Sequence, residues 1–258
     1  MSTPACDVRD DRMQRLQQIG RGVAVGGGEE MLWVGRHQRS RGLLLALSPA
    51  GRSVEQLAVS LAPAVIRHQA RLLVIRNQRS AGSTHCIETA LQRLASATDW
   101  LTEPLLLLGV DESVQAAQSW VMANPGKASA IVLVGDLSNA WPKGGLGAGQ
   151  RTVALSPSSA TQPSPGAVAG LLRVPCQVLL SEADEPWGRA WNCRLQAVAD
   201  AGGIKSPVTL HALSCTEPLY HLDSLGEEVM RCCKPYLGEE GAGFRSARSS
   251  PGSVYFIT

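Results

Sequence analysis

Short apolar runs alternate with amphipathic stretches along most of this chain. The apolar runs lie at 42–47, 72–75, 105–108, 131–134, 174–180 and 208–213, and turn residues bound most of them. Runs of this kind are typical of strands that are buried on both faces of a sheet. Between them, the stretches 54–66, 87–95 and 222–237 carry apolar residues at helical spacing. This order of strands and helices predicts an α/β domain with a mostly parallel sheet and helices on both faces.

The chain begins with a different pattern. Two short strands are expected at 22–25 and 31–35, and the glycines at 26–28 suit a tight turn between them. They predict an N-terminal antiparallel hairpin. The first amphipathic stretch begins behind Ser53, a good N-cap residue, and holds Pro63 in its interior. Because proline lacks an N–H and clashes with the preceding turn, Pro63 predicts a kink or an early break in that helix.

Composition divides the chain into three parts. Residues 1–18 form a polar N-terminal segment, 19–238 a single domain, and 239–258 a tail rich in Gly, Ser and Arg that we expect to be flexible. Within the domain, residues 137–172 interrupt the alternation of strands and helices and are rich in Gly, Ser and Pro. A stretch of this length usually forms a lid or an insertion loop, and we expect one of these here.

The overall composition is that of a globular protein. Of the 258 residues, 44% are hydrophobic and 18% are charged, and the net charge of +2 gives no reason to expect a nucleic-acid partner. No apolar run approaches the ~20 residues that span a bilayer, and the polar start does not resemble a secretory signal. The seven cysteines include no C-x-x-C pair, so no zinc site is indicated. We therefore expect a cytoplasmic protein with a small-molecule substrate or ligand, and no membrane contact, metal or cofactor.

The most informative candidate chemistry follows the leucine run at 105–108. The residues Gly109-Val110-Asp111-Glu112-Ser113 come directly after this strand and lead into a helical pattern. A sharp turn from strand to helix is where the G-x-S-x-G motif exposes a catalytic serine, and Asp111 occupies the position of that serine. Its carboxylate could act as a nucleophile and form an ester that water hydrolyses with the help of a histidine. Two alternatives stay open: Asp111 is a helix N-cap, or the turn is shifted by two residues and Ser113 is the nucleophile.

An acid and a histidine are then expected later in the chain, in this order. Glu182 and Asp184 follow the strand at 174–180, where an acid would orient a histidine. His221 lies on the loop between the last strand and the final helix. A histidine there could take a proton from water or a nucleophile, because its pKa lies near neutral pH. The alternatives are a solvated acidic loop and a surface histidine, while His211, inside a strand pattern, is predicted to be structural.

The order of these elements, from about Met31 to Leu237, resembles an α/β-hydrolase with a degraded nucleophile elbow. The resemblance implies a hydrolase of a small ester, thioester or related substrate. Its atypical Asp-Asp-His site would consist of Asp111 as nucleophile or electrostatic helper, Asp184 as the orienting acid and His221 as the base. Residues 137–172 would then form the lid.

Two departures from the pattern favour a second hypothesis. Haloalkane dehalogenases and epoxide hydrolases of that superfamily use an aspartate nucleophile that a tryptophan usually follows, whereas Glu112 follows Asp111 here. The loop that should supply an oxyanion-hole N–H reads Ser48-Pro49-Ala50-Gly51, and Pro49 has no N–H to donate. In this second hypothesis, the fold is kept as a binding or interaction module without turnover.

Overall fold

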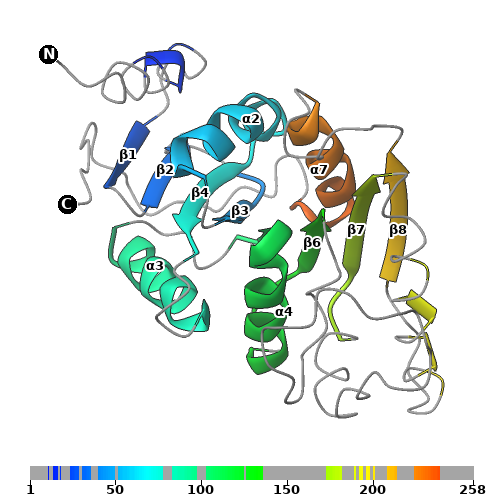
Figure 1. Cartoon of the computed structure of the whole chain (residues 1–258). Coiled ribbons are helices and arrows are strands. Elements are labelled where there is room, and N and C mark those ends of the chain that lie inside the picture. The colour runs from blue at the N-terminus through cyan, green and yellow to red at the C-terminus, as the bar shows by residue number, and fades with distance from the viewer. Residues whose placement is uncertain are drawn as a thin grey trace, which may run out of the picture.

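A sheet of mostly parallel strands lies at the centre of the computed structural model (Figure 1). The structure describes residues 11, 14–16, 18, 24–28, 31–35, 40–49, 52–77, 83–97, 103–124, 126–135, 173–181, 189, 192–193, 196–197, 200, 208–213 and 224–238. In these ranges the strands are β1 (Ala24–Gly28), β2 (Met31–Gly35), β3 (Leu43–Ser48), β4 (Arg71–Arg76), β5 (Leu105–Val110), β6 (Ala130–Val134), β7 (Cys176–Ser181) and β8 (Val208–Leu213). They lie side by side in the order β1-β2-β4-β3-β5-β6-β7-β8. β2 is antiparallel to both β1 and β4, and every other neighbouring pair is parallel.

The predicted N-terminal hairpin is confirmed, but its turn lies elsewhere. β1 and β2 pair antiparallel, and Gly26, Gly27 and Gly28 are paired with residues of β2. The prediction that these glycines form the turn is therefore wrong. Glycine adopts an extended backbone as readily as a turn, and here the pairing with the apolar residues of β2 determines its conformation.

Helices cover both faces of the sheet, as the alternating pattern predicts. Four longer helices are described: α2 (Val54–Arg67), α3 (Ser83–Ala97), α4 (Val114–Ala123) and α7 (Leu225–Cys233). The helices α2 and α7 contribute to one core cluster, whereas α3 and α4 contribute to the cluster on the opposite face. Figure 1 shows α2 and α7 together on one side of the sheet, with α3 and α4 on the other.

The N-terminus of α2 is capped by Ser53, as the sequence predicts. The Gln56 N–H donates to Oγ of Ser53 at 3.3 Å, and the Ser53 N–H donates to Oε1 of Gln56 at 3.1 Å. These two bonds form a capping box. The early break predicted at Pro63 is wrong, because α2 continues to Arg67. Pro63 is exposed while its neighbours Ala62 and Ala64 are buried, so the packed face keeps the helix continuous.

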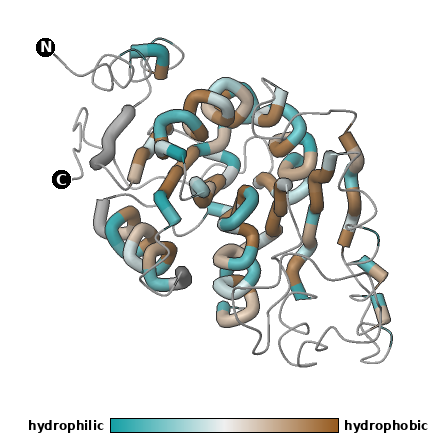
Figure 2. Tube along the Cα trace, viewed as in Figure 1, coloured by the Kyte–Doolittle hydropathy of each residue, from teal (hydrophilic) through white to brown (hydrophobic). Residues whose placement is uncertain are grey.

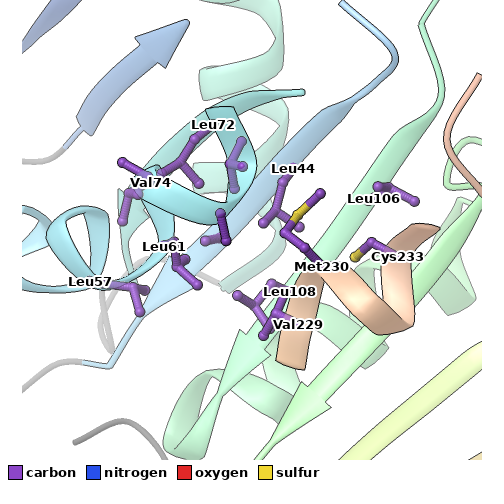
Figure 3. Close-up of a cluster of buried hydrophobic side chains, with 14 of the residues drawn as sticks. Leu44, Leu57, Leu61, Leu72, Val74, Leu106, Leu108, Val229, Met230 and Cys233 are labelled. Atoms are coloured by element: carbon purple, nitrogen blue, oxygen red, sulfur yellow. The ribbon is translucent and has the colours of Figure 1, made fainter. Parts of the chain in front are cut away.

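The leucine run at 105–108 lies in the centre of the sheet, where it connects the two core clusters. Leu105 and Leu107 belong to the cluster under α3 and α4, whereas Leu106 and Leu108 belong to the one under α2 and α7. Figure 3 shows the second cluster, which contains Leu106 and Leu108 together with Met230 of α7. Along the tube in Figure 2, hydrophobic residues follow the central strands, while the helices alternate between hydrophobic and hydrophilic positions. A strand buried on both faces is thus confirmed.

The parallel strands bring several chain segments to one edge of the sheet. Gly109 of β5 is paired with Leu47 of β3 and with Leu133 of β6, so the carboxyl ends of these three strands are level. In open α/β sheets, ligands bind at this edge. Ser48, Asp111 and Gly135 all lie here, at or directly after the ends of their strands.

Candidate functional site

Asp111 follows β5 directly and has an unusual backbone conformation. Its φ is +48°, in the left-handed region, and it begins a single 3-10 turn, Asp111–Ser113, that leads into α4. Among the described residues, Gln69 is the other non-glycine residue with a positive φ. Gln69 comes directly after His68, the C-cap of α2, where helices often end in this conformation. No helix end accounts for the conformation of Asp111.

Gly109 makes this turn tight. A Cβ on Gly109 would lie 2.9 Å from Cβ of Ala117 and 2.9 Å from Cα of Val114. The helix therefore passes so close to the strand that only glycine fits at this position. This is the contact expected of the first residue in a sharp strand-to-helix turn.

The structure bears on both alternatives for this segment. The residue with positive φ is Asp111, and Ser113 is buried at the start of α4 with a φ of −82°, so the turn is not shifted by two residues as the Ser113 alternative requires. The N-cap of the 3-10 turn is Val110 and that of α4 is Ser113, and neither has a side-chain capping bond. The interpretation of Asp111 as the helix N-cap is therefore also wrong.

The carboxylate of Asp111 contacts the end of the neighbouring strand. Gly135 follows β6 and has a φ of +94°, and a Cβ on it would lie 2.0 Å from Oδ1 of Asp111. This contact did not emerge from the sequence. The only signal in the sequence is a glycine directly after an apolar run, which by itself indicates no more than a turn.

Solved structures with a similar fold were found, but no protein-family model matches the chain and no curated protein matches its sequence. A poly(3-hydroxybutyrate) depolymerase from Bordetella parapertussis has a TM-score of 0.56 and 13% identity over 90% of this chain and 95% of its own. A carboxyl esterase 2 from Tuber melanosporum has a TM-score of 0.55 and 11% identity, over 84% of this chain and 85% of its own. A poly(aspartic acid) hydrolase-1 from Sphingomonas sp. KT-1 has a TM-score of 0.54 and 13% identity, over 81% and 96%. This chain has the α/β-hydrolase fold.

Within this α/β-hydrolase fold, the loop after β3 is held close to the site edge. The Arg52 N–H donates to the Pro49 carbonyl at 3.0 Å, and Oγ of the buried Ser48 donates to the Arg52 carbonyl at 3.3 Å. The Asn77 N–H, just after β4, donates to the Ser48 carbonyl at 3.1 Å. Ala50 and Gly51, the candidate oxyanion donors, lie outside the described residues.

Asp111 is the one member of the predicted Asp-Asp-His site that the structure describes. Asp184, its alternative Glu182, and His221 lie outside the described residues, as does the lid or insertion predicted at 137–172. His211 lies within β8 as the pattern indicates, and its Nε2 is 2.7 Å from Oε1 of Gln177. Burial and the nearby Arg231 charge lower the pKa of His211, although Glu228 opposes them.

No group of three His, Cys, Asp or Glu side chains in the described ranges is arranged to hold a metal ion. The thiols of Cys176 and Cys233 are fully buried, which raises the pKa of each. Burial also raises the pKa of Cys232, to about 11. Buried thiols of this kind act as small hydrophobic side chains. No helix formed by the described residues is long and apolar enough to cross a membrane.

Proposed function

We propose that the chain is a hydrolase of a small ester, thioester or related substrate, with Asp111 as its nucleophile. The backbone conformation of Asp111 is the observation that carries the proposal. A non-glycine residue at positive φ is uncommon, although aspartate adopts this conformation more readily than most residues, and such residues cluster at active sites. No helix end explains the φ of +48° at Asp111, whereas a chemical role of this residue does. The esterase and depolymerase of similar fold favour the ester class.

The reaction would take place in two steps at the carboxyl edge of the sheet. A carboxylate oxygen of Asp111 would attack the acyl carbon of the substrate, the ester C–O or thioester C–S bond would break, and the alcohol or thiol would depart as its anion, leaving a mixed anhydride on Asp111. His221 would then accept a proton from water, and this water would hydrolyse the intermediate and regenerate the carboxylate. Asp184 would hold the imidazole of His221 in the required orientation.

The second candidate is an α/β-hydrolase fold that binds a ligand without turnover. Pro49 favours it, because proline at the start of the loop after β3 removes one N–H that could stabilise an oxyanion. Under this proposal the positive φ of Asp111 would serve only to place a carboxylate beside a bound ligand. Turnover separates the two candidates.

The first experiment measures turnover of short- and medium-chain p-nitrophenyl esters and acyl thioesters. We expect wild-type activity that falls by about 100-fold or more in Asp111→Asn and in His221→Ala, as is typical when a nucleophile or base is removed. Glu112→Gln is the matched control, because it removes the adjacent carboxylate and should keep the activity. Activity that survives in both Asp111→Asn and His221→Ala would contradict the proposed site, and no turnover on the panel would favour the binding module.

A second measurement distinguishes a nucleophile from an electrostatic helper. The purified enzyme is mixed with less than one equivalent of the best substrate in H₂¹⁸O, and the peptide that contains Asp111 is analysed by mass spectrometry. Attack of water on the Asp111 carbonyl of the intermediate would leave ¹⁸O in the carboxylate. The absence of both ¹⁸O and an acyl adduct on the Asp111 peptide after an acid quench, at every substrate tested, would assign Asp111 the role of helper.

A further inference from the structure

The strand β4 begins and ends with an arginine, and the two arginines have different surroundings. At the amino edge, Nη1 of Arg71 lies 3.0 Å from Oε1 of Glu103, and the guanidinium lies over the ring of Trp33. At the carboxyl edge, Arg76 is half-buried, and its Nε is buried without a hydrogen-bond partner in the part of the chain that the structure describes. A charged donor withdrawn from water without a partner is unfavourable. The lack of a partner for Nε of the half-buried Arg76 therefore has to be explained, whereas Arg71 is already paired with Glu103.

Other unpaired polar atoms gather at the same edge. In the described ranges, the buried side-chain atoms without a hydrogen-bond partner are Nε of Arg71, Oε2 of Glu103, Nε of Arg76, Oδ1 of Asn77 and Oγ of Ser113. The first two belong to the ion pair at the amino edge. Nε of Arg76 and Oδ1 of Asn77 lie at and directly after the carboxyl end of β4, and Asn77 is only 7% exposed, whereas the fully buried Ser113 lies three residues beyond β5, at the start of α4. Buried polar atoms in native proteins are rarely left unpaired, so this edge is suited to a polar ligand.

The register of the strands places Arg76 within reach of the Asp111 site. Arg76 is paired with Ser48 of β3, the residue after Leu47, and Leu47 is paired with Gly109 of β5. The backbones of Arg76 and Val110 are therefore level, two strand spacings or about 10 Å apart. Because the arginine and aspartate side chains extend from the backbone, a ligand that contacts both charged groups can be shorter than this backbone distance. Guanidinium groups in partly buried positions bind carboxylates and phosphates better than ammonium groups do.

We infer that Arg76 forms an anion subsite, and that the substrate carries a carboxylate or phosphate in addition to the group that Asp111 attacks. The position of the attacked atom rests on the proposed function, whereas anion binding at Arg76 does not. The subsite narrows the substrate class to esters or thioesters of acids that bear a second, anionic group. Neutral short-chain esters would react without this contact.

Anion binding is tested first, by thermal unfolding in the presence of glutarate or of inorganic phosphate. Asp111→Asn is used with the wild type, so that the result does not depend on turnover. We expect at least one of the two anions to raise the Tm of both proteins and to leave that of Arg76→Met unchanged. The anion that acts distinguishes a carboxylate from a phosphate site. Arg173→Met is the matched control, since it removes an exposed arginine from the opposite edge and should respond as the wild type does.

Two outcomes of this measurement would overturn the subsite. In the first, neither anion raises the Tm of the wild type. In the second, an anion raises the Tm of Arg76→Met by as much as it raises that of the wild type. In the absence of anion, we expect Arg76→Met to have an unchanged or higher Tm, because it removes an unpaired, half-buried charge. A lower Tm without anion, together with equal losses on every substrate, would show that Arg76 has only a structural role.

Turnover then tests the link to the proposed function. For the monoester of glutaric acid with p-nitrophenol, we expect Arg76→Met to lower kcat/KM by about tenfold or more, mainly through KM, as the loss of a charge-assisted hydrogen bond predicts. On p-nitrophenyl butyrate the change should stay within about twofold, and Arg76→Lys should recover part of the loss. If the wild type hydrolyses neither ester but still binds the anion, the proposed function fails and the subsite stands.

Discussion

The carboxylate of Asp111 lies directly against Gly135, and the contact leaves no space for a larger residue. A Cβ on Gly135 would lie 2.0 Å from Oδ1 of Asp111, and the φ of +94° at Gly135 disfavours any other residue as well. Val110 and Val134, the residues that precede them, are paired between β5 and β6. The position of the carboxylate is therefore determined from both strands.

Substitution of Gly135 by alanine should both destabilise the protein and displace the carboxylate. We expect Gly135→Ala to lose about 2 kcal/mol or more in the free energy of unfolding, since a backbone cost of about 1–2 kcal/mol is added to a steric clash. Gly126→Ala is the matched control, because Gly126 has a similar φ of +86° and no atom within 4 Å of its Cβ position. Urea unfolding of the two variants should give a larger loss at Gly135, and equal losses would contradict the contact.

The same contact predicts that the two residues are coupled. In an Asp111→Ala background, Gly135→Ala should cost about as little as Gly126→Ala does, because the colliding carboxylate is absent. A double-mutant cycle from urea unfolding measures this coupling. If Gly135→Ala costs the same with and without the Asp111 side chain, the clash is relieved elsewhere and Gly135 does not position the carboxylate.

The sequence predicts well those features that local chemistry determines. The run Leu105–Leu108 is apolar at every position and is a central strand, and Ser53 is the N-cap of α2. The errors arise where packing overrides a local preference. Pro63 disfavours a helix locally, but α2 continues through it on its packed face.

The candidate site is predictable only in part, for a related reason. The position of Asp111 after an apolar strand can be read from the sequence, because the strand, the turn and the helix are contiguous. The contact with Gly135 and the level positions of Arg76 and Val110 depend on which strands are neighbours and in what register. A single sequence does not contain that information in any local pattern.

The close approach of α2 and α7 gives a second stability prediction. Alanine usually stabilises a helix relative to glycine by about 1 kcal/mol, but a Cβ on Gly226 of α7 would lie 2.6 Å from the Ser60 carbonyl oxygen of α2. The helices would have to separate, so we expect Gly226→Ala to lose about 1–3 kcal/mol in urea unfolding, the usual cost of overpacking. A gain in stability would contradict the observed helix contact.

Removing one partner of the Arg71–Glu103 ion pair at the amino edge should lower the free energy of unfolding more than replacing both partners with apolar residues. Arg71→Met leaves the carboxylate of Glu103 without its cation, and we expect a loss of about 3 kcal/mol at pH 7. The double variant Arg71→Met/Glu103→Leu should lie close to the wild type, because apolar pairs often replace buried ion pairs without loss. Arg67→Met is the control: its ion pair with Glu227 is exposed and should change stability by about 1 kcal/mol or less.

The pH dependence of the stability of Arg71→Met follows from the pKa of Glu103. Burial raises this pKa above 4.5, while the Arg71 charge and a hydrogen bond from Ser40 oppose the rise. The contribution of Glu103 to stability is therefore largest below pH 4.5 and decreases as the pH rises through the folded-state pKa. Since Arg71→Met removes an opposing charge, its loss of stability should be smaller at pH 4 than at pH 7. A loss that does not change with pH would contradict this assignment.

His211 should make the protein less stable in mild acid. Burial, followed by the charge of Arg231, lowers the pKa of His211, whose Nε2 lies 2.7 Å from Oε1 of Gln177. A lowered pKa means that the folded state favours the neutral imidazole, so its contribution to stability is present above about pH 6.5. It is lost as the pH falls through the folded-state pKa. Urea midpoints at pH 7.5 and 5 should therefore differ less in His211→Gln than in the wild type. Arg231→Gln should also reduce the difference, because it removes a charge that opposes protonation, and an unchanged difference in both variants would exclude His211 as its source.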